Sequence, residues 1–441
     1  MTIQQRDVKN SEPSRRSFLK ATTVTAAGLA VASHSKAAWA QEKLAINGGP
    51  PAIPAPDTDA WRWPRYGSEE EQAMLNFLRA PGYSANADFE KEWCEHVGVP
   101  FARSYCNGTS ALLSMFFALN LPPGSEIMVP SYTFFATIVP MRLFGLVPVF
   151  VDINPRTLNF DLEDAKKRLT PNTKAVLPVH WIGLPCDMDV ICDWAKEKGL
   201  IVLEDAAHAQ YAKVKGIHTG AWGEMGIFSY QMSKPLPGIE GGMGVYKTQE
   251  YHDRATLFGH YDTPGIADDS PYKKYNGTGL GTKTRMHPMS AELLRCQLRL
   301  LKERVAAGVA QTRRLNDVLV QLPGLYEQTS GRSDVQRLYY EWNMLFIDEK
   351  EAGAPRDAVV AALKAEGVRA DALSYRLQHK QPLYTESEWW HHLPVIPELP
   401  GSETANATSI ALPYFTKHAP EMVNGYIKAF EKVWAHRSEL A

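Results

Sequence analysis

The sequence predicts an α/β fold, in which a large domain with a mostly parallel sheet covered by helices precedes a smaller α+β domain. From about residue 87 onward, short apolar runs typical of strands alternate with helical patterns, as they do in βαβ units. These runs are apolar enough for a sheet with both faces covered. A length of 441 residues, with 44% hydrophobic and 22% charged residues, suits a globular protein with a sizeable core.

Residues 1–40 form a predicted targeting segment rather than part of the fold. The paired arginines of "SRRSFLK" precede a modestly apolar stretch, and "AWA", a small-x-small cleavage site, ends at Ala40. An amphipathic N-terminal segment is the alternative, but this order of parts predicts a twin-arginine signal peptide cleaved after Ala40. We therefore expect the twin-arginine export machinery as a partner and a periplasmic or otherwise exported protein. No apolar run reaches the roughly 20 residues that span a bilayer.

Residues 41–86 are predicted to form an N-terminal arm and a helix. The segment "EKLAINGGPPAIPAPDTDAWRWP" is rich in proline and glycine, which favours an extended arm. The segment "SEEEQAMLNFLRAP" begins with acidic residues, which suit the positive end of a helix dipole.

Residues 87–300 are predicted to form the large domain. Helical patterns lie in "TSALLSMFFALNL", "FFATIVPMRLFG" and "MDVICDWAKEKG", and strand patterns lie in "SEIMVPSY", "VPVFVDI", "KAVLPVHWIG", "LIVLEDAAHA" and "IFSYQ". The ligand crevice of such a sheet lies at the carboxyl ends of its strands. Polar side chains that directly follow these strands are therefore candidate site residues.

Residues 301–441 are predicted to form a linking helix and a small C-terminal domain. The long helical pattern from Met289 to Leu322 links this part to the large domain. After it, "RLYYEWNMLFID" has the pattern of a strand, whereas "RDAVVAALKAEG" and "EMVNGYIKAFEKVW" have the pattern of helices. This mixture predicts an α+β arrangement.

The charge balance and the cysteines exclude several classes of protein. The net charge is −2, so a dedicated nucleic-acid binder, which carries a basic surplus, is not expected. Five cysteines form an odd, sparse set that does not suit a disulfide framework. None of them has the spacing of a zinc site, and we expect no metal.

One lysine, Lys234, occupies an unusual place in "FSYQMSKPLPGIEGG". It follows a short apolar strand pattern and precedes a glycine-rich turn, which places it at the mouth of a strand. A desolvated lysine with a lowered pKa is what imine formation with an aldehyde cofactor requires. The alternative is an ordinary loop lysine, so other parts of the chain have to decide.

Two further strand–helix junctions carry polar candidates. In "CNGTSALL", Gly108 and Thr109 lie where a loop enters a helix, a place that binds phosphate readily, although an ordinary N-cap also fits. In "VLEDAAHAQ", Asp205 and His208 lie just past an apolar strand. A carboxylate there can hold a pyridinium nitrogen protonated, although a turn-capping Asp and a core histidine fit equally well.

Two more residues complete a possible cofactor site. Phe134 offers a flat apolar surface at a strand end, although such an aromatic residue often belongs to the core. Ser229, five residues before Lys234, could hydrogen-bond a phosphate. Together the candidates supply a phosphate cradle, a partner for a ring nitrogen, a stacking face and an imine-forming lysine, which points to pyridoxal 5′-phosphate.

At this point the sequence resembles the DegT/DnrJ/EryC1/StrS aminotransferases, which are pyridoxal-phosphate enzymes of fold type I. The resemblance covers nearly all of the chain after the signal, through an ordered series that includes "LAINGGPPA", "FEKEWCEHVGVPFARSYCNGTSAL", "VPSYTFFATIVPMRLFGLVPVFVDI", "EDAAHA", "FSYQMSKPLPGIEGG" and "GTKTRMHPMSAELLRCQL". It implies a homodimer whose active sites use both subunits. The ordered series is far more specific than any one piece.

The resemblance also implies roles for the candidate residues. Lys234 would form the imine and Asp205 would hold the pyridine nitrogen, while His208 would approach the ring hydroxyl. Phe134 would stack on the ring, and the phosphate would be held by Gly108, Thr109 and Ser229.

Two segments depart from the family pattern. Where the family has asparagine in Gly-x-Asn-x-Arg-Met, this chain has "GTKTRM", so Lys283 would reach the phosphate of the neighbouring subunit as a point charge. After the catalytic lysine, Pro235 and Pro237 of "KPLP" stiffen the loop. We expect the prolines to fix the loop rather than to abolish the chemistry.

The implied reaction is ping-pong transamination, with glutamate or glutamine as donor and a keto-sugar or cyclitol-type ketone as acceptor. Lys234 would move a proton as general base and acid. Two alternatives stay open at this point. One is another pyridoxal-phosphate reaction, such as that of a racemase or lyase, and the other is a non-catalytic binding or regulatory protein of the same fold.

Overall fold

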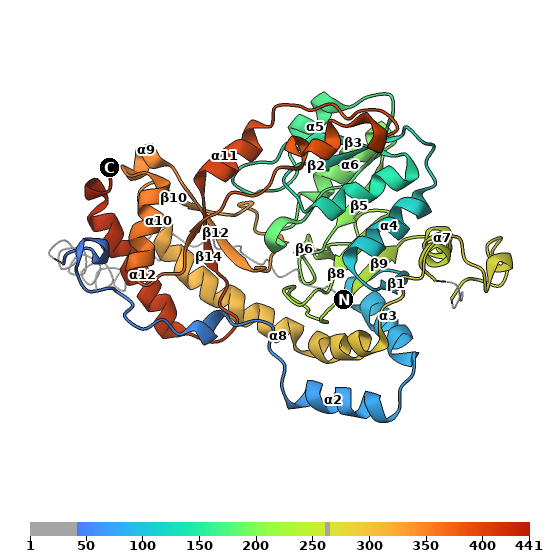
Figure 1. The fold of residues 1–441 in the computed structure, drawn as a ribbon, viewed down its shortest axis with the longest axis horizontal. Coiled ribbons are helices and arrows are strands. Elements are labelled where there is room, and N and C mark those ends of the chain that lie inside the picture. The colour runs from blue at the N-terminus through green and yellow to red at the C-terminus, as the bar shows by residue number, and fades with distance from the viewer. Residues whose placement is uncertain (1–41, 261–264) are drawn as a thin grey trace, which may run out of the picture.

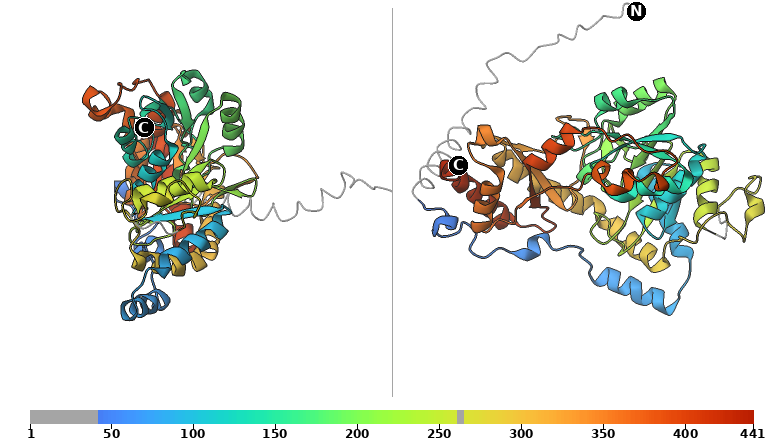
Figure 2. Two further views of the ribbon diagram at one scale, coloured as in Figure 1. Left: turned by 90° about the vertical axis from the view of Figure 1, so that its right-hand side faces the viewer. Right: turned by 45° about the horizontal axis from the view of Figure 1, so that its top comes forward.

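The computed structural model describes residues 42–260 and 265–441 (Figure 1, Figure 2). The predicted signal peptide and its cleavage point after Ala40 lie outside the described residues. Within the described ranges, no helix is both long enough and apolar enough to cross a membrane. The α-helices are α2 (Ser68–Arg79), α3 (Ser84–Val97), α4 (Gly108–Leu119), α5 (Leu162–Arg168), α6 (Met188–Lys198), α7 (Gln249–Gly259), α8 (Pro288–Leu319), α9 (Glu349–Ala352), α10 (Arg356–Ala365), α11 (Pro400–Thr408) and α12 (Pro420–Ala435).

Seven strands form the large sheet, in the order β1-β9-β8-β5-β4-β2-β3. Five of them pair in parallel with their neighbours, namely β2, β3, β4, β5 and β8. The predicted α/β fold with a mostly parallel, helix-covered sheet is confirmed. The strands are β1 (Phe101–Tyr105), β2 (Glu126–Pro130), β3 (Val147–Val151), β4 (Thr173–Val176), β5 (Ile201–Asp205), β8 (Met225–Ser229) and β9 (Gly242–Tyr246).

Strand β9 was not expected from the sequence, and it runs antiparallel to both β1 and β8. Its glycines make the segment resemble a loop. They are required by close packing, because a Cβ on Gly242 would come within 2.3 Å of the carbonyl oxygen of Asn107, and one on Gly244 within 2.1 Å of the hydroxyl of Tyr246. A strand made of such residues lacks the apolar periodicity on which sequence analysis depends.

Helices cover both faces of the large sheet (Figure 1). Helices α4 and α7 pack on the face that carries Ile127 and Ile227. On the other face, α5 and α6 pack with Met128, while α3 and α8 pack with Phe228. Consecutive strand residues thus serve opposite layers, because side chains alternate between the two faces of a strand.

One predicted helix differs in type from what the sequence suggested. The segment "FFATIVPMRLFG" forms two short 3₁₀ helices, η4 (Phe135–Thr137) and η5 (Val139–Phe144), because Pro140 lacks the N–H that a continuous α-helix would need there. The other 3₁₀ helices are η2 (Ala45–Asn47), η3 (Thr58–Trp61), η6 (Trp181–Gly183), η7 (Lys273–Tyr275), η8 (Gln378–Lys380), η9 (Pro382–Tyr384), η10 (Ser387–Trp389) and η11 (Arg437–Glu439). The predicted N-terminal arm contains two of these turns, η2 and η3.

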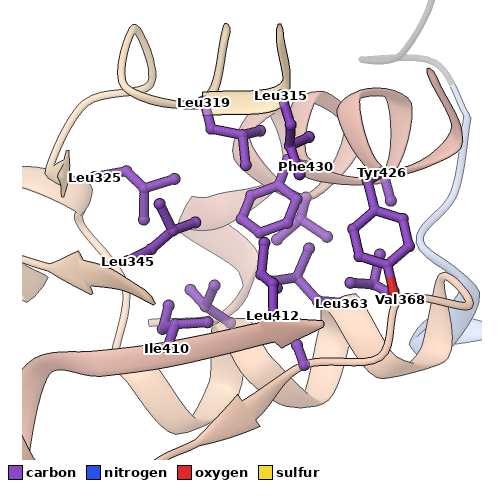
Figure 3. Packing of buried hydrophobic residues seen from close by; sticks show 14 of the residues in the cluster. Leu315, Leu319, Leu325, Leu345, Leu363, Val368, Ile410, Leu412, Tyr426 and Phe430 are labelled. Carbon is purple, nitrogen blue, oxygen red and sulfur yellow. The ribbon is translucent and has the colours of Figure 1, made fainter. Parts of the chain in front are cut away.

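A four-stranded antiparallel sheet lies toward the C-terminus, in the order β10-β12-β14-β13. It packs with α8, α10 and α12 around an apolar cluster that includes Leu319, Leu345, Leu363, Leu412 and Phe430 (Figure 3). Its strands are β10 (Leu325–Glu327), β12 (Trp342–Ile347), β13 (Asp371–Ala372) and β14 (Ser409–Pro413). A third, small sheet is formed by β6 (Lys213–Val214), β7 (Ile217–His218) and β11 (Val335–Gln336).

Helix α8 connects the two larger sheets over 32 residues (Figure 1). It contacts α2 and α3 near the large sheet and α12 near the C-terminal sheet. The predicted domain boundary between residues 300 and 301 falls inside this helix, and the division of the chain into domains stays a prediction.

A buried ion pair ties the N-terminal arm to the C-terminal helices. Glu366 and Lys432 are both fully buried, with the Lys432 Nζ donating to Glu366 Oε2 over 3.0 Å. The same carboxylate accepts the N–H groups of Ala45 and Ala52 at 2.8 Å each, and Lys432 also donates to the carbonyl oxygen of Pro50 at 2.7 Å. The two charges depend on each other and on these backbone groups, because a buried charge that loses its partner strongly destabilises the folded protein.

We expect Lys432→Met to lower the free energy of unfolding by about 3–5 kcal/mol, because it leaves the Glu366 carboxylate buried without its cation. Guanidinium denaturation at pH 7 measures this change. The control is Lys364→Met, which removes the exposed pair with Asp371 and should cost less than about 1 kcal/mol. Equal effects of the two substitutions would contradict the proposed anchoring.

Candidate active site

A cavity of about 530 Å³ lies where β5 and β8 end and where α4 begins. This is the carboxyl-end crevice at which parallel sheets bind ligands. The cavity brings together seven of the eight predicted site residues, although their roles stay predictions. The seven are Gly108, Thr109, Phe134, Asp205, His208, Ser229 and Lys234.

Lys234 lies half-buried in the loop between β8 and β9. Its Nζ donates to the hydroxyl of Tyr340 over 3.1 Å. The loop is held in place on both sides, because the Lys234 N–H donates to the carbonyl oxygen of Gln231 at 2.8 Å and the indole of Trp63 donates to the Lys234 carbonyl at 3.0 Å. Burial lowers the pKa of Lys234 to about 8, against the opposing attraction of Asp205 and Glu341. About a tenth of the amine is therefore neutral, and nucleophilic, at pH 7, far more than for an ordinary lysine.

Asp205 ends β5 and is buried beside the cavity. Its carboxylate accepts the Thr137 hydroxyl at 2.8 Å and the Ala207 N–H at 3.1 Å. Burial raises the pKa of Asp205, while these two hydrogen bonds and the charge of Lys234 act in the opposite direction. A buried carboxylate with few hydrogen-bond partners among the described residues is suited to hold a positively charged ring nitrogen.

Glu204 precedes Asp205 and points to the other side of β5, where it is fully buried. Its carboxylate accepts the N–H groups of Gly220, Trp222 and Gly223 at 2.7–2.8 Å and contacts His180 Nε2 at 3.0 Å. These bonds fix the end of β5, and so they fix Asp205.

His208 lies on the turn after β5, with its Nδ1 accepting the N–H of Ile182 at 3.3 Å. Burial, with a contribution from Lys234, lowers the pKa of His208 well below its usual value. The ring is therefore neutral at pH 7 and carries its hydrogen on Nε2, since Nδ1 accepts. Its ring lies between those of Trp181 and Tyr340, at centroid distances of 5.0 and 4.4 Å.

The start of α4 forms a polar cradle at the cavity wall. The Asn107 side chain caps the helix by accepting the N–H of Ser110 at 2.8 Å, whereas Gly108 and Thr109 line the cavity in the first turn. Helix N–H groups at these positions have no acceptor within the helix and bind anions. Gly108 allows α4 to approach the end of β8, because a Cβ there would lie 3.0 Å from that of Ser229.

Phe134 and Lys283 have different surroundings. Phe134 lines the cavity with 51% of its surface exposed, so its ring offers a free apolar face. Lys283 lies on an exposed segment before α8 and does not line the cavity of its own chain. Its expected contact with a neighbouring subunit stays a prediction.

Sequence analysis missed several residues of the cavity wall, among them Asn107, Thr137, Tyr340, Glu341 and Tyr375. Asn107 could have been found as a helix-capping residue directly before the glycine. The others gave no local signal, because they come from a 3₁₀ helix and from segments more than 100 residues after Lys234.

We expect Lys234 to react with an amine-directed reagent along a pH profile whose midpoint is near 8, about two units below that of an ordinary lysine, because only its neutral form reacts. Competitive labelling followed by peptide mass spectrometry measures the midpoint. Labelling of exposed Lys302 in the same samples reports the effect of pH on the reagent itself. A Lys234 midpoint above 10 would contradict the desolvated environment.

Comparison with known proteins places the chain in a family. The profile of the DegT/DnrJ/EryC1/StrS aminotransferase family matches residues 67–431. The chain belongs to this family. A twin-arginine translocation signal matches residues 12–32, which agrees with the predicted type of signal. As a member of this family the protein is an aminotransferase, as predicted.

Relatives and solved structures agree with this placement. The spore coat polysaccharide biosynthesis protein SpsC of Bacillus subtilis (strain 168) is 30% identical over 84% of this chain and 95% of its own. The 3-amino-5-hydroxybenzoate synthase of Amycolatopsis mediterranei (strain S699) is 29% identical over 81% of this chain and 98% of its own. An aminotransferase from Psychrobacter cryohalolentis has a TM-score of 0.77 at 25% identity, covering 85% of this chain and 99% of its own, and is similar in fold.

The cavity fits the pyridoxal phosphate that enzymes of this family generally use. The α4 cradle offers backbone N–H groups and hydroxyls for a phosphate, and Asp205 offers a buried carboxylate for a ring nitrogen. Lys234 offers a partly neutral amine, and Phe134 offers an exposed ring face. The residues present therefore match each part of the cofactor.

Proposed function

We propose that this protein is a pyridoxal-phosphate aminotransferase that moves an amino group from glutamate or glutamine to a keto-sugar or cyclitol-type ketone. The observation that carries the proposal is the meeting of Lys234, Asp205 and the α4 cradle in one cavity of a chain that belongs to this family. When bound, the cofactor would supply an aldehyde that condenses with amines and a ring that accepts electrons from the reacting carbon.

Each residue of the cavity has a separate role around the bound cofactor. Gly108, Thr109 and Ser229 bind the phosphate, and Asp205 keeps the ring nitrogen protonated. His208, neutral with its hydrogen on Nε2, donates to the ring hydroxyl oxygen. Lys234, in its neutral form, would accept a proton from the α-carbon of the donor and pass it on toward the cofactor rather than back to that carbon, so that the donor leaves as a keto acid. The keto product leaves before the ketone enters, because both occupy the same cavity.

The acceptor is proposed from the relatives and the export signal. A putative L-glutamine:3-amino-2,3-dideoxy-scyllo-inosose aminotransferase of Streptoalloteichus tenebrarius is 30% identical over 90% of this chain and 93% of its own, and its name specifies a cyclitol ketone with a glutamine donor. Nucleotide-activated sugars are cytoplasmic, whereas a protein exported by the twin-arginine route works elsewhere. A cyclitol-type ketone that occurs outside the cytoplasm therefore suits the location of an exported protein better.

Several structural features belong to the same proposal. The signal is cleaved after Ala40 in the periplasm, following folding and cofactor uptake in the cytoplasm. The mature chain forms a homodimer in which Lys283 reaches the phosphate of the neighbouring site. Residues 41–86, 87–300 and 301–441 act as arm, large domain and small domain.

We expect glutamate or glutamine to discharge the visible absorption band of the cofactor-loaded mature protein and to yield the corresponding keto acid. Absorption spectroscopy and keto-acid detection measure the two events. Lys234→Ala should show neither, because it removes the amine that binds the cofactor and moves the proton, whereas the exposed-site control Lys302→Ala should show both.

Other outcomes of this experiment favour the alternatives. A change in the absorption spectrum without release of a keto acid would favour a racemase or lyase reaction. An absorption band that no amino acid changes would favour a binding role. No band at all, even with added cofactor, would refute the role of Lys234.

We expect Gly108→Ala to weaken the binding of pyridoxal phosphate by about tenfold or more, because the added Cβ crowds Ser229 and deforms the cradle. The matched ligand is pyridoxal, which lacks the phosphate and should bind equally well to both proteins. Equilibrium titration of the absorption band measures both affinities. An equal loss for the two ligands would exclude Gly108 from the phosphate site.

A further inference from the structure

We propose that Tyr340 is a positioning residue that holds the free amine of Lys234 through a hydrogen-bond chain of fixed direction. Tyr340 lies just before β12, 106 residues after Lys234, and separates the active-site cavity from a second, neighbouring cavity of about 300 Å³. Its hydroxyl is 3.1 Å from Lys234 Nζ and 2.8 Å from Ser233 Oγ.

The direction of the chain follows from Gln231. Its Oε1 accepts both the backbone N–H of Ser233 at 2.8 Å and the Ser233 hydroxyl at 2.7 Å. Ser233 has a single hydroxyl hydrogen, so its oxygen can only accept from Tyr340. The Glu341 side chain is a second acceptor for the Tyr340 hydroxyl, so the Tyr340 hydrogen is used by Ser233 or by Glu341. Toward Lys234, the Tyr340 oxygen therefore acts as an acceptor. Protons on Lys234 point toward this acceptor, and the chain cannot reverse while Ser233 is bound to Gln231.

The phenol of Tyr340 is fixed in place and stays protonated. Burial raises its pKa to beyond the range in which proteins work, so it is a neutral acceptor throughout. Its ring lies 4.4 Å from that of His208 and 4.3 Å below Lys234 Nζ, in a cation–π contact. The lysine and the histidine of the site are thus held by the same ring.

The backbone is strained to place this residue. Glu341 has a φ of 62°, which is unfavourable for a residue other than glycine, and the N–H of Trp342 reaches back to the Tyr340 carbonyl at 2.6 Å. The tight turn directs both Tyr340 and Glu341 toward the cavity, where each acts on Lys234. Strain of this kind persists where the surrounding structure requires the conformation.

The contact has a measurable consequence for Lys234. An acceptor stabilises the ammonium form more than the amine, so it opposes the lowering of the pKa by burial. Without Tyr340, the pKa of Lys234 would fall further and the amine would lose its resting position between reaction steps. The meaning of the contact for catalysis rests on the proposed function, but the contact itself can be tested on the protein without cofactor.

The test is the pH midpoint of Lys234 labelling by an amine-directed reagent in three variants. Tyr340→Phe should lower the midpoint by about 0.5–1 pH unit relative to the unmodified sequence, because a hydrogen bond to a charged group is lost. Ser233→Ala should lower it by a smaller amount, because the Tyr340 hydrogen loses its Ser233 acceptor and is less firmly directed away from Lys234, although Glu341 can still accept it. The control Tyr339→Phe removes the neighbouring buried hydroxyl, which has no hydrogen-bond partner within the described ranges, and should leave the midpoint unchanged.

The outcomes separate this proposal from the proposed function. An unchanged midpoint in Tyr340→Phe, or an equal shift in Tyr339→Phe, would overturn the role of Tyr340. If Tyr340→Phe does not fold, Ser233→Ala decides, and an unchanged midpoint there overturns the chain. A protein that binds no cofactor but shows the expected shifts would refute the proposed function and support the contact.

Discussion

Two consecutive carboxylates end β5, and the rest of the site is arranged around keeping both of them out of water. A buried carboxylate is costly unless donors surround it. Because neighbouring residues of a strand face opposite ways, Glu204 and Asp205 need separate sets of donors. Glu204 has the N–H groups of the turn at residues 220–223, whereas the donors to Asp205 in the described part of the chain are Thr137 and Ala207. The fully satisfied carboxylate anchors the strand, and the less satisfied one faces the cavity.

Lys234 is the cationic counterpart of this arrangement. Burial lowers its pKa, while Asp205 and Glu341 limit how far it falls, so the amine is held between its charged and neutral forms. Burial raises the pKa of Asp205 and of Glu341, whereas the charge of Lys234 acts to lower both. The pKa of each of these groups is shifted from its ordinary value by the burial of the group and by the charges of the others. Their reactivity depends on this shared, partly buried environment, in which water screens charges less than it does on an exposed surface.

The C-terminal sheet completes the cavity that the large sheet begins. The tight turn directly before β12 places Tyr340 and Glu341 beside the lysine loop, and α8 connects the two sheets that carry the two sides of the cavity. The N-terminal arm joins the same junction through the bond from Trp63 to the Lys234 carbonyl. Contacts between segments far apart in sequence thus determine how far the site is buried and where the Lys234 amine lies.

The sequence by itself determined the alternation of strands and helices and the residues at strand ends, since apolar periodicity and chain order are local properties. On that basis it predicted that Lys234, Asp205 and the start of α4 would meet, because the carboxyl ends of parallel strands share one edge. It did not predict β9, whose glycines serve a close approach and carry no periodicity. Nor did it predict Tyr340, because nothing local distinguishes an aromatic residue that will contact a lysine 106 residues away. Only tertiary packing decided those contacts, and with them the environment that sets the protonation of Lys234.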